Sequence, residues 1–218
     1  CLSRGLGDVY KRQGLKITAL SGHLKYPCMF LHDAKCAAAT ELWNRRDLTD
    51  AIYLSIGKHL GGAVIIGGQT VMGKQNHGGA VEHMTLIPGG RPCYCGKSGC
   101  METYCSVNAL IHEEETLEEF FTGLRDGEEE KKRRFDDYLD HLSTAVNNLH
   151  MVMDCDVILG GHMAPYLTRA DMDILHEKVW EKSAFPDEED FIFLSETARD
   201  SVPVGAALEF VRGFLDGI

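Results

Sequence analysis

The chain has 218 residues, 44% of them hydrophobic, and its 33 acidic side chains outnumber 22 basic ones to give a net charge of -11. That length suits one domain, or one lobe of a larger protein, with enough apolar side chains to form a core. An acidic chain without a basic stripe argues against nucleic-acid binding through this region. The longest apolar run, at residues 60–68, is too short and too glycine-rich to span a bilayer, so no membrane partner is expected.

The first thirteen residues, CLSRGLGDVYKRQ, show no apolar periodicity and no continuity with the residues after them. They resemble a translated sequencing-adapter scar, so residues 1–13 are excluded from reasoning about the fold. We expect the natural sequence to occupy residues 14–218 and to start in the middle of a longer protein.

Eight cysteines in a chain with no recognisable signal peptide indicate a reducing compartment, and we expect a cytoplasmic protein. Four of these cysteines lie in apolar contexts and are predicted to be core thiols: Cys28, Cys36, Cys105 and Cys155.

Strand-like and helix-like segments alternate along the rest of the chain. Short apolar or β-branched runs predict strands at residues 27–31, 51–56, 60–66, 70–72, 155–159 and 191–194. Helical patterns lie at residues 34–44, 102–111, from 116, from 128 to 153, around 175 and at 204–215. This mixture indicates an α/β domain.

Two of the helices carry recognisable start signals. Residues 116–119 read Thr-Leu-Glu-Glu, which is the capping-box pattern of a helix N-terminus. The three glutamates at 128–130 each precede a basic residue by four positions, a spacing that supports an exposed helix start through ion pairs.

The most informative stretch holds three cysteines and two glycines between residues 93 and 100, with a histidine ten residues before the first cysteine. Thiolate and imidazole groups at this spacing can close a tetrahedral zinc site. The four predicted ligands are His83, Cys93, Cys95 and Cys100. Because all four ligands come from the protein, the zinc would be structural. The alternative is a loop of reduced or disulfide-paired cysteines, although a Cys-x-Cys pair is poorly placed for a disulfide.

The pattern His-(x9)-Cys-x-Cys-Gly-x-x-Gly-Cys-x-Glu at residues 83–102 resembles the signature of the ROK family of repressors, open reading frames and sugar kinases. The resemblance runs from about residue 14 to residue 215. It implies an actin-like, ribonuclease H-like ATPase fold, with this chain supplying mainly the C-terminal lobe. The N-terminal ATP-binding lobe is missing, so we expect the fragment alone to be inactive.

Asp33 is the candidate catalytic residue. Residues 32–38 are similar to the family motif Asn-Asp-Ala-Asn-x-Ala-Ala, whose aspartate is the catalytic base, with His32 standing at the sugar-contacting asparagine and Lys35 at the second one. The aspartate follows a predicted strand end, where open α/β folds build ligand sites. By local pattern alone, Asp33 could equally be a helix N-cap.

The hairpin predicted at residues 51–66 contains stretches that resemble the family's second phosphate-contacting hairpin. Gly57, Gly61 and Gly62 would let backbone N–H groups approach phosphate oxygens. Ile56 stands where the family usually has threonine, which removes a hydroxyl from the phosphate site. A glycine-containing hairpin with no ligand is the alternative.

Sugar contacts are implied near the predicted metal. Family kinases carry Glu-x-Gly-His, whereas this chain has Ala80-Val81-Glu82-His83, so the carboxylate moves from three positions before the histidine to one. The resemblance implies sugar contacts from Glu82 and His83, and from Glu102 beyond the last cysteine. For Glu102, a surface carboxylate at a helix start is the alternative.

Two further segments resemble the family. Residues 156–162 are similar to the strand and glycine turn that packs under the adenosine of ATP, which assigns Gly160 and Gly161 to the nucleotide. Residues 201–208 match its C-terminal Gly-Ala-Ala helix, a packing element.

The resemblance implies a parent protein that phosphorylates a hexose or an N-acetylhexosamine, with Asp33 as base and Mg²⁺-ATP as phosphoryl donor. Zinc would hold the sugar-binding loop rigid. The alternative is the sugar-sensing effector domain of a transcriptional repressor, which the departures at His32, Ile56 and Ala80 favour. DNA would then be a partner only through a helix-turn-helix in the missing N-terminal part. A zinc-stabilised α/β domain without sugar binding is a third possibility. Family members are commonly homodimers or tetramers, so a homo-oligomer is expected.

Overall fold

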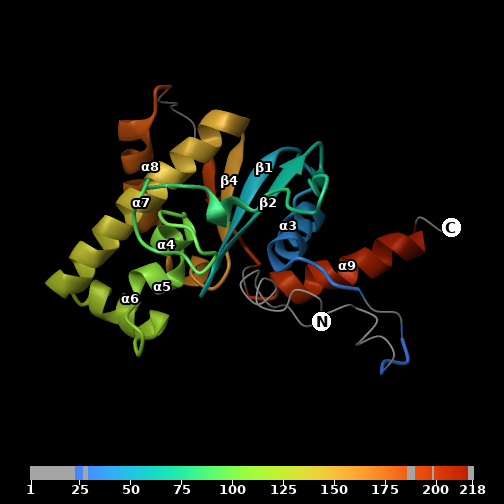
Figure 1. Cartoon of the computed structure of the whole chain (residues 1–218), viewed down its shortest axis with the longest axis horizontal. Helices are drawn as coiled ribbons and strands as arrows, with labels where there is room; N and C mark the ends of the chain where they lie inside the picture. Colours follow the sequence, from blue (N-terminus) through green and yellow to red (C-terminus); the bar gives the residue numbers. More distant parts are fainter. Residues whose placement is uncertain (1–22, 27–28, 186–189, 198, 216–218) are drawn as a thin grey trace.

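A five-stranded sheet with helices on both faces forms the centre of the computed structural model, which describes residues 23–26, 29–185, 190–197 and 199–215 (Figure 1). The strand order is β3-β2-β1-β4-β5. The strands are β1 (Ala51–Ile56), β2 (Leu60–Ile66), β3 (Gln69–Thr70), β4 (Asp156–Gly160) and β5 (Ile192–Leu194). Strands β1, β2 and β3 pair antiparallel, whereas β4 runs parallel to both β1 and β5. The predicted α/β class and the predicted hairpin are confirmed.

Helices cover both faces of this sheet. The α-helices are α3 (Asp33–Asn44), α4 (Glu102–Cys105), α5 (Val107–Leu110), α6 (Leu117–Arg125), α7 (Glu129–Met153), α8 (Arg169–Lys182) and α9 (Ser201–Leu215). Two 3-10 helices are η1 (Val81–His83) and η2 (Ala164–Tyr166). Figure 1 shows α3 and α9 on one side of the sheet and α7 and α8 on the other. None of the described helices is long and apolar enough to cross a membrane.

The central strand β1 is buried on both faces, and its residues alternate between the two helical layers as a strand period of two requires. Tyr53 packs with Ala37 and Ala38 of α3, while Leu54 and Ile56 join the larger cluster formed with the helices of the opposite face. This strand therefore holds the two halves of the core together, and its C-terminal end enters the candidate site.

The long helix α7 supplies the apolar stripe predicted for it. The five stripe residues are all buried: Phe135, Leu139, Leu142, Val146 and Leu149. Of the predicted pairs four residues apart, only Glu130 with Arg134 is formed among the described residues, at 2.8 Å. Lys131 and Lys132 instead pair with the glutamates three positions before them.

The predicted strand at residues 27–31 is wrong for the part that the structure describes. Residues 29–31 have no strand partner, and Met29 and Phe30 are exposed. The run leads directly into α3 as irregular backbone. A short apolar run is weak evidence because a strand also needs a neighbour to pair with.

The predicted helix at residues 102–111 is two short helices, α4 and α5. Ser106 interrupts them in an extended conformation. The N–H of Val107 donates to the carbonyl of Gly57 at 2.8 Å, so a bond to the hairpin replaces the helical one. The third strand lies at Gln69–Thr70, slightly before the predicted residues 70–72.

Other local predictions hold. Thr116 and Glu119 form the predicted capping box at the start of α6. Cys36 and Cys105 are buried free thiols, whereas Cys155 is half-buried. Cys28 and residues 1–13 lie outside the described residues, so the predictions made for them stay predictions.

Helices α3 and α9 touch through their backbones. A Cβ added at Gly205 of α9 would overlap the carbonyl group of Cys36 in α3. Only glycine permits this approach, which fits the packing role predicted for the Gly-Ala-Ala segment.

We expect Gly205→Ala to destabilise the fold. In an ordinary helix this change stabilises by about 1 kcal/mol, but here the methyl group must displace the backbone of α3. The free energy of unfolding, measured by urea denaturation, should fall by about 1–3 kcal/mol. Ala207→Ser, at an exposed position of the same helix, should change it by less than about 0.5 kcal/mol. A more stable Gly205→Ala protein would contradict the backbone contact.

Candidate functional site

Asp33 lies at the first residue of α3, next to the tip of the β1–β2 hairpin. It lines a small hollow of about 30 Å³ together with His32, Ser55, His59, Leu60 and Gly61. That volume holds about one water molecule, so the hollow marks where groups converge and is not itself a sugar-sized pocket.

The placement of Asp33 differs from the sequence prediction in one respect. No described strand precedes it, and His32 rather than Asp33 is the N-cap residue, without a side-chain capping bond. An Asp33 oxygen, Oδ1, accepts a hydrogen bond from the N–H of Ala34 at 2.8 Å. A carboxylate in the first turn of a helix is stabilised by the helix dipole, and in the hollow it stands where it could accept a proton.

His32 and Lys35 flank this carboxylate. The Nδ1 atom of His32 lies 3.4 Å from Asp33 Oδ1. Burial lowers the pKa of His32, and the opposing effect of the Asp33 charge does not cancel it. Burial also lowers the pKa of Lys35, whose ammonium donates to the carbonyl of Asn76 at 3.1 Å. Lys35 thus ties α3 to the glycine-rich loop that leads to η1.

Glu102 is buried at the start of α4 and bonds the hairpin tip through both carboxylate oxygens. One oxygen lies 2.7 Å from Nδ1 of His59, and the other accepts from the N–H of Leu60 at 2.7 Å. The surface-carboxylate alternative for Glu102 is therefore wrong.

Glu82, on η1, is completely buried, and neither of its carboxylate oxygens has a hydrogen-bond partner among the described residues. Burial raises its pKa to about 7, and the charges of Glu102 and Asp33 act in the same direction. A buried carboxylate without partners is rare and needs an explanation. It has two acceptor oxygens to offer a ligand.

The four predicted zinc ligands come together. Their ligand atoms all lie within 4.8 Å of one another, with Cys95 Sγ 3.7 Å from Cys100 Sγ and Cys93 Sγ 3.8 Å from His83 Nδ1. Two thiolates on one tetrahedral zinc, each at about 2.3 Å, would be about 3.8 Å apart. The cluster therefore has the dimensions of a Cys3His zinc site.

Backbone turns at two glycines shape this cluster. Gly96 and Gly99 have φ angles of 87° and 84°, and a Cβ at Gly99 would overlap the carbonyl oxygen of Ile87. Burial and the neighbouring sulfurs raise the pKa of Cys100 to about 12. The thiolates that zinc requires would therefore form with the help of the cation's own charge.

Tyr94 joins the cluster to the hairpin. Its ring makes edge contacts with His83 and His59, with centroid distances of 5.3 and 5.1 Å. The hairpin tip is thus contacted by Tyr94 of the cysteine loop and by Glu102 at the start of α4.

Of the glycines predicted to bind nucleotide, Gly57 directly follows β1, Gly61 and Gly62 lie near the start of β2, and Gly160 and Gly161 lie at the end of β4. Close backbone packing explains several of them: a Cβ at Gly62 would lie 2.5 Å from the carbonyl oxygen of Gly79, and one at Gly161 would lie 2.6 Å from the nitrogen of Ile56. A Cβ at Gly160 would overlap the hydroxyl of Tyr53. The packing accounts for their small size, and a contact with nucleotide stays a prediction.

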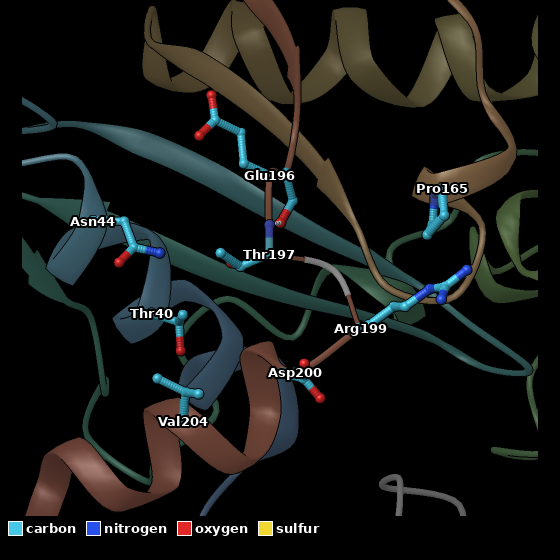
Figure 2. Close-up of a pocket in the computed structure, with 9 residues that line it drawn as sticks. Thr40, Asn44, Pro165, Glu196, Thr197, Arg199, Asp200 and Val204 are labelled. Atoms are coloured by element: carbon cyan, nitrogen blue, oxygen red, sulfur yellow. Dashed lines mark hydrogen bonds between the residues drawn. The ribbon is translucent and has the colours of Figure 1, made fainter.

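A second pocket, of about 520 Å³, lies between α3, the start of α9 and the segment after β5 (Figure 2). Its lining includes Thr40, Ser195, Arg199 and Asp200 but none of the predicted site residues. The Thr40 hydroxyl donates to the carbonyl of Ser201 at 2.6 Å, and the Ser195 hydroxyl donates to Glu41. These buried hydroxyls are therefore used within the fold, whereas the hollow at Asp33 is lined by predicted site residues.

Comparison with known proteins identifies the family. The model of the ROK family matches residues 9–205. The chain belongs to the ROK family.

Among curated ROK-related proteins, the glucokinase of Halalkalibacterium halodurans is 33% identical over 94 residues, covering 42% of this chain and 28% of that protein. The N-acetyl-D-glucosamine kinase of Shigella boydii is 26% identical over 167 residues, covering 67% of this chain and 55% of that protein. This chain thus spans little more than half the length of the second relative and less of the first.

Solved structures share the fold of this ROK chain. A ROK family glucokinase from Streptomyces griseus, in complex with glucose and AMPPNP, has a TM-score of 0.80 at 19% identity, covering 88% of this chain and 70% of that one. A ROK family transcriptional regulator, a homologue of the E. coli MLC protein, has a TM-score of 0.73 at 19% identity, covering 88% and 53%. The same fold therefore occurs in a ROK kinase and in a ROK transcriptional regulator.

One site residue of this ROK chain was not predicted. His59 lines the hollow with Asp33 and holds Glu102. The sequence could have indicated this residue, because a phosphate-contacting hairpin usually carries small residues at its tip and this chain carries a histidine there.

We expect the purified chain to carry about one zinc ion. Cys95→Ala should lose the metal and unfold at a lower temperature, because three ligands hold zinc less tightly than four. Elemental analysis and thermal melts measure both effects. Cys155→Ala, a half-buried thiol outside the cluster, should keep the metal. A folded, metal-free wild-type chain would overturn the assignment.

Proposed function

We propose that the protein to which this chain belongs phosphorylates a hexose or an N-acetylhexosamine with ATP. One observation carries the proposal: Asp33, a hairpin glycine (Gly61) and His59 line the same hollow. A base and a phosphate-type turn are the two parts that phosphoryl transfer to a sugar needs next to each other. The glucokinase and N-acetylglucosamine kinase among the relatives support the same activity class.

Asp33 would accept the proton of the attacking sugar hydroxyl as its oxygen bonds the γ-phosphorus. The leaving ADP would carry away the electrons of the broken phosphoanhydride bond, and Mg²⁺ bound with ATP would neutralise the phosphate charges. Backbone N–H groups near Gly57, Gly61 and Gly62 would contact phosphate, and Gly160 and Gly161 would lie under the adenosine. Ile56 offers no hydroxyl here, so the phosphates would depend on backbone donors.

The sugar would be bound between α3, η1 and the start of α4. Glu82 has two buried acceptor oxygens without partners among the described residues, which is what a ligand rich in hydroxyl groups requires. His32, His83 and Glu102 would complete the contacts. Zinc on His83 and the three cysteines would keep η1 and the cysteine loop in place when the ligand leaves.

Residues 14–218 would form the C-terminal lobe of a cytoplasmic ROK protein, with residues 1–13 as a non-native scar. The lobe that holds the remaining ATP contacts would precede it. A homodimer or tetramer would be the working assembly.

The second candidate function is a sugar-sensing effector domain of a repressor. The specific observations in its favour are Ile56 and Ala80, where the hydroxyl and carboxylate of the family's kinases are missing, and the fold match to a ROK transcriptional regulator. A sensor needs the sugar site but no phosphoryl transfer, and DNA would be bound by a helix-turn-helix outside this chain.

Asp33→Asn separates the two functions. The assay uses the full-length natural protein that contains this chain. We expect this variant to lower its kcat for ATP-dependent sugar phosphorylation by about 10²–10⁴-fold, because the general base is gone. Sugar binding, measured by titration calorimetry, should change less than about threefold, since an amide keeps the shape and one acceptor.

The matched control for this test is Asp47→Asn, at an exposed position just after α3, which should leave both quantities unchanged. Sugar binding without any turnover, in the wild type and in Asp33→Asn alike, would favour the sensor.

A further inference from the structure

Lys35 carries a buried positive charge that no step of the proposed chemistry uses. It lies in the first turn of α3, two residues after Asp33, and only 7% of its surface is exposed. Lysine is almost never buried unless its charge is paired. Among the described residues no carboxylate pairs with Lys35, and burial lowers the pKa of its side chain. A charge in such a place is unfavourable by itself and needs an explanation.

The hydrogen-bond partners of this ammonium all belong to the glycine-rich loop, residues 71–80, which connects β3 to η1. The Nζ atom of Lys35 donates to the carbonyl of Asn76 at 3.1 Å and to that of Met72 at 3.5 Å. It also lies 3.7 Å from the sulfur of Met72. Because Met72 and Asn76 stand on opposite arms of the loop, one ammonium holds both arms.

The far end of the glycine-rich loop is fixed on β2 and runs directly into η1. The N–H of Gly78 donates to the same Met72 carbonyl at 2.9 Å, and the N–H of Val81 donates to the carbonyl of Gly79 at 2.8 Å. A Cβ at Gly79 would lie 2.8 Å from the Cα of Ala63 on β2. Residues 72–77 are exposed, so this part of the loop buries little surface of its own to hold it in place.

Stability alone does not account for a charge at this position. Replacing a buried charge by an apolar side chain of similar volume is often neutral or even stabilising. An ammonium offers what an apolar side chain lacks, namely three donors that can be directed at carbonyl oxygens. Those donors favour one conformation of the glycine-rich loop over the others that an exposed, glycine-containing segment can adopt.

We propose that Lys35 is a positioning residue of the sugar site: its ammonium fixes the glycine-rich loop and thereby sets where η1 presents Glu82 and His83. The same turn of α3 carries Asp33, so one side chain holds the base and the sugar-contacting η1 at a fixed separation. This inference rests on the proposed sugar-binding function and adds to it a residue that need not touch the ligand.

The test uses the full-length natural protein and two substitutions of this lysine. Lys35→Met keeps an unbranched side chain but removes the charge and all three donors, whereas Lys35→Arg keeps both. Lys74→Met is the matched control, because it removes the same charge from an exposed position of the glycine-rich loop.

Dissociation constants are measured by titration calorimetry for glucose, N-acetylglucosamine and N-acetylmannosamine. We expect Lys35→Met to weaken binding of the sugar that binds best by about tenfold, the size of one charge-assisted hydrogen bond, with Lys74→Met unchanged. Lys35→Arg should recover most of the affinity, because its guanidinium can donate to the same carbonyls.

Two further measurements separate positioning from a merely structural role. The melting temperature of Lys35→Met without sugar should fall by less than about 4 °C, since the lost bonds are offset by removal of a buried charge. Hydrogen exchange of residues 71–83, followed by mass spectrometry, should become faster in Lys35→Met and stay unchanged in Lys74→Met.

The outcomes distinguish this inference from the function beneath it. If the wild-type protein binds none of the sugars, the proposed function fails, and the role of Lys35 fails with it. If the wild type binds a sugar and Lys35→Met binds it equally well, only the role of Lys35 is overturned. That role is also overturned if the affinity is lost together with a large fall in melting temperature that Lys35→Arg does not reverse.

Discussion

Glu102 carries a buried carboxylate that bonds the turn between β1 and β2 through both oxygens, and the candidate site is arranged around that pair of bonds. One bond orients His59 and the other fixes the backbone at Leu60. Removing this carboxylate would leave the backbone N–H of the buried Leu60 unpaired, which costs more than the loss of an exposed contact would. The β1–β2 turn, with its glycines, and the end of the cysteine loop are therefore held in a fixed position relative to each other.

The cysteine loop depends on this anchor because it has little regular structure of its own. Between η1 and α4 the described backbone forms turns and two isolated bridges, Thr85 with Cys100 and Pro92 with Ser98. Such a segment buries too little apolar surface to order itself. A metal on His83 and the three cysteines would supply a cross-link at one end, and Glu102 supplies one at the other. Glu82 directly precedes His83 on η1, so the metal would also help to keep this otherwise unfavourable buried carboxylate in place.

Sequence patterns predicted those features that local chemistry decides. The β1–β2 hairpin followed from β-branched runs around a short turn, and the zinc-sized cluster from three cysteines within eight residues and a histidine nearby. The features that were missed are contacts across long stretches of chain. The His59–Glu102 bond joins residues 43 apart, and the helix break at Ser106 arises from a bond between Val107 and Gly57. Within the strand expected at residues 27–31, the described residues 29–31 form no strand for the same reason, because pairing is decided by distant neighbours.

The crossing of α3 and α9 bears on how freely the surroundings of the site can vary. At Gly205 and Cys36 no side chain lies between the two helices, so side-chain volume does not set their separation there. Asp33 stands three residues before Cys36 on the same rigid helix. The backbone contact therefore fixes how far from the sheet α3 holds the Asp33 carboxylate. Substitutions among the apolar residues around this contact would therefore change the stability of the fold more readily than they would change the position of Asp33.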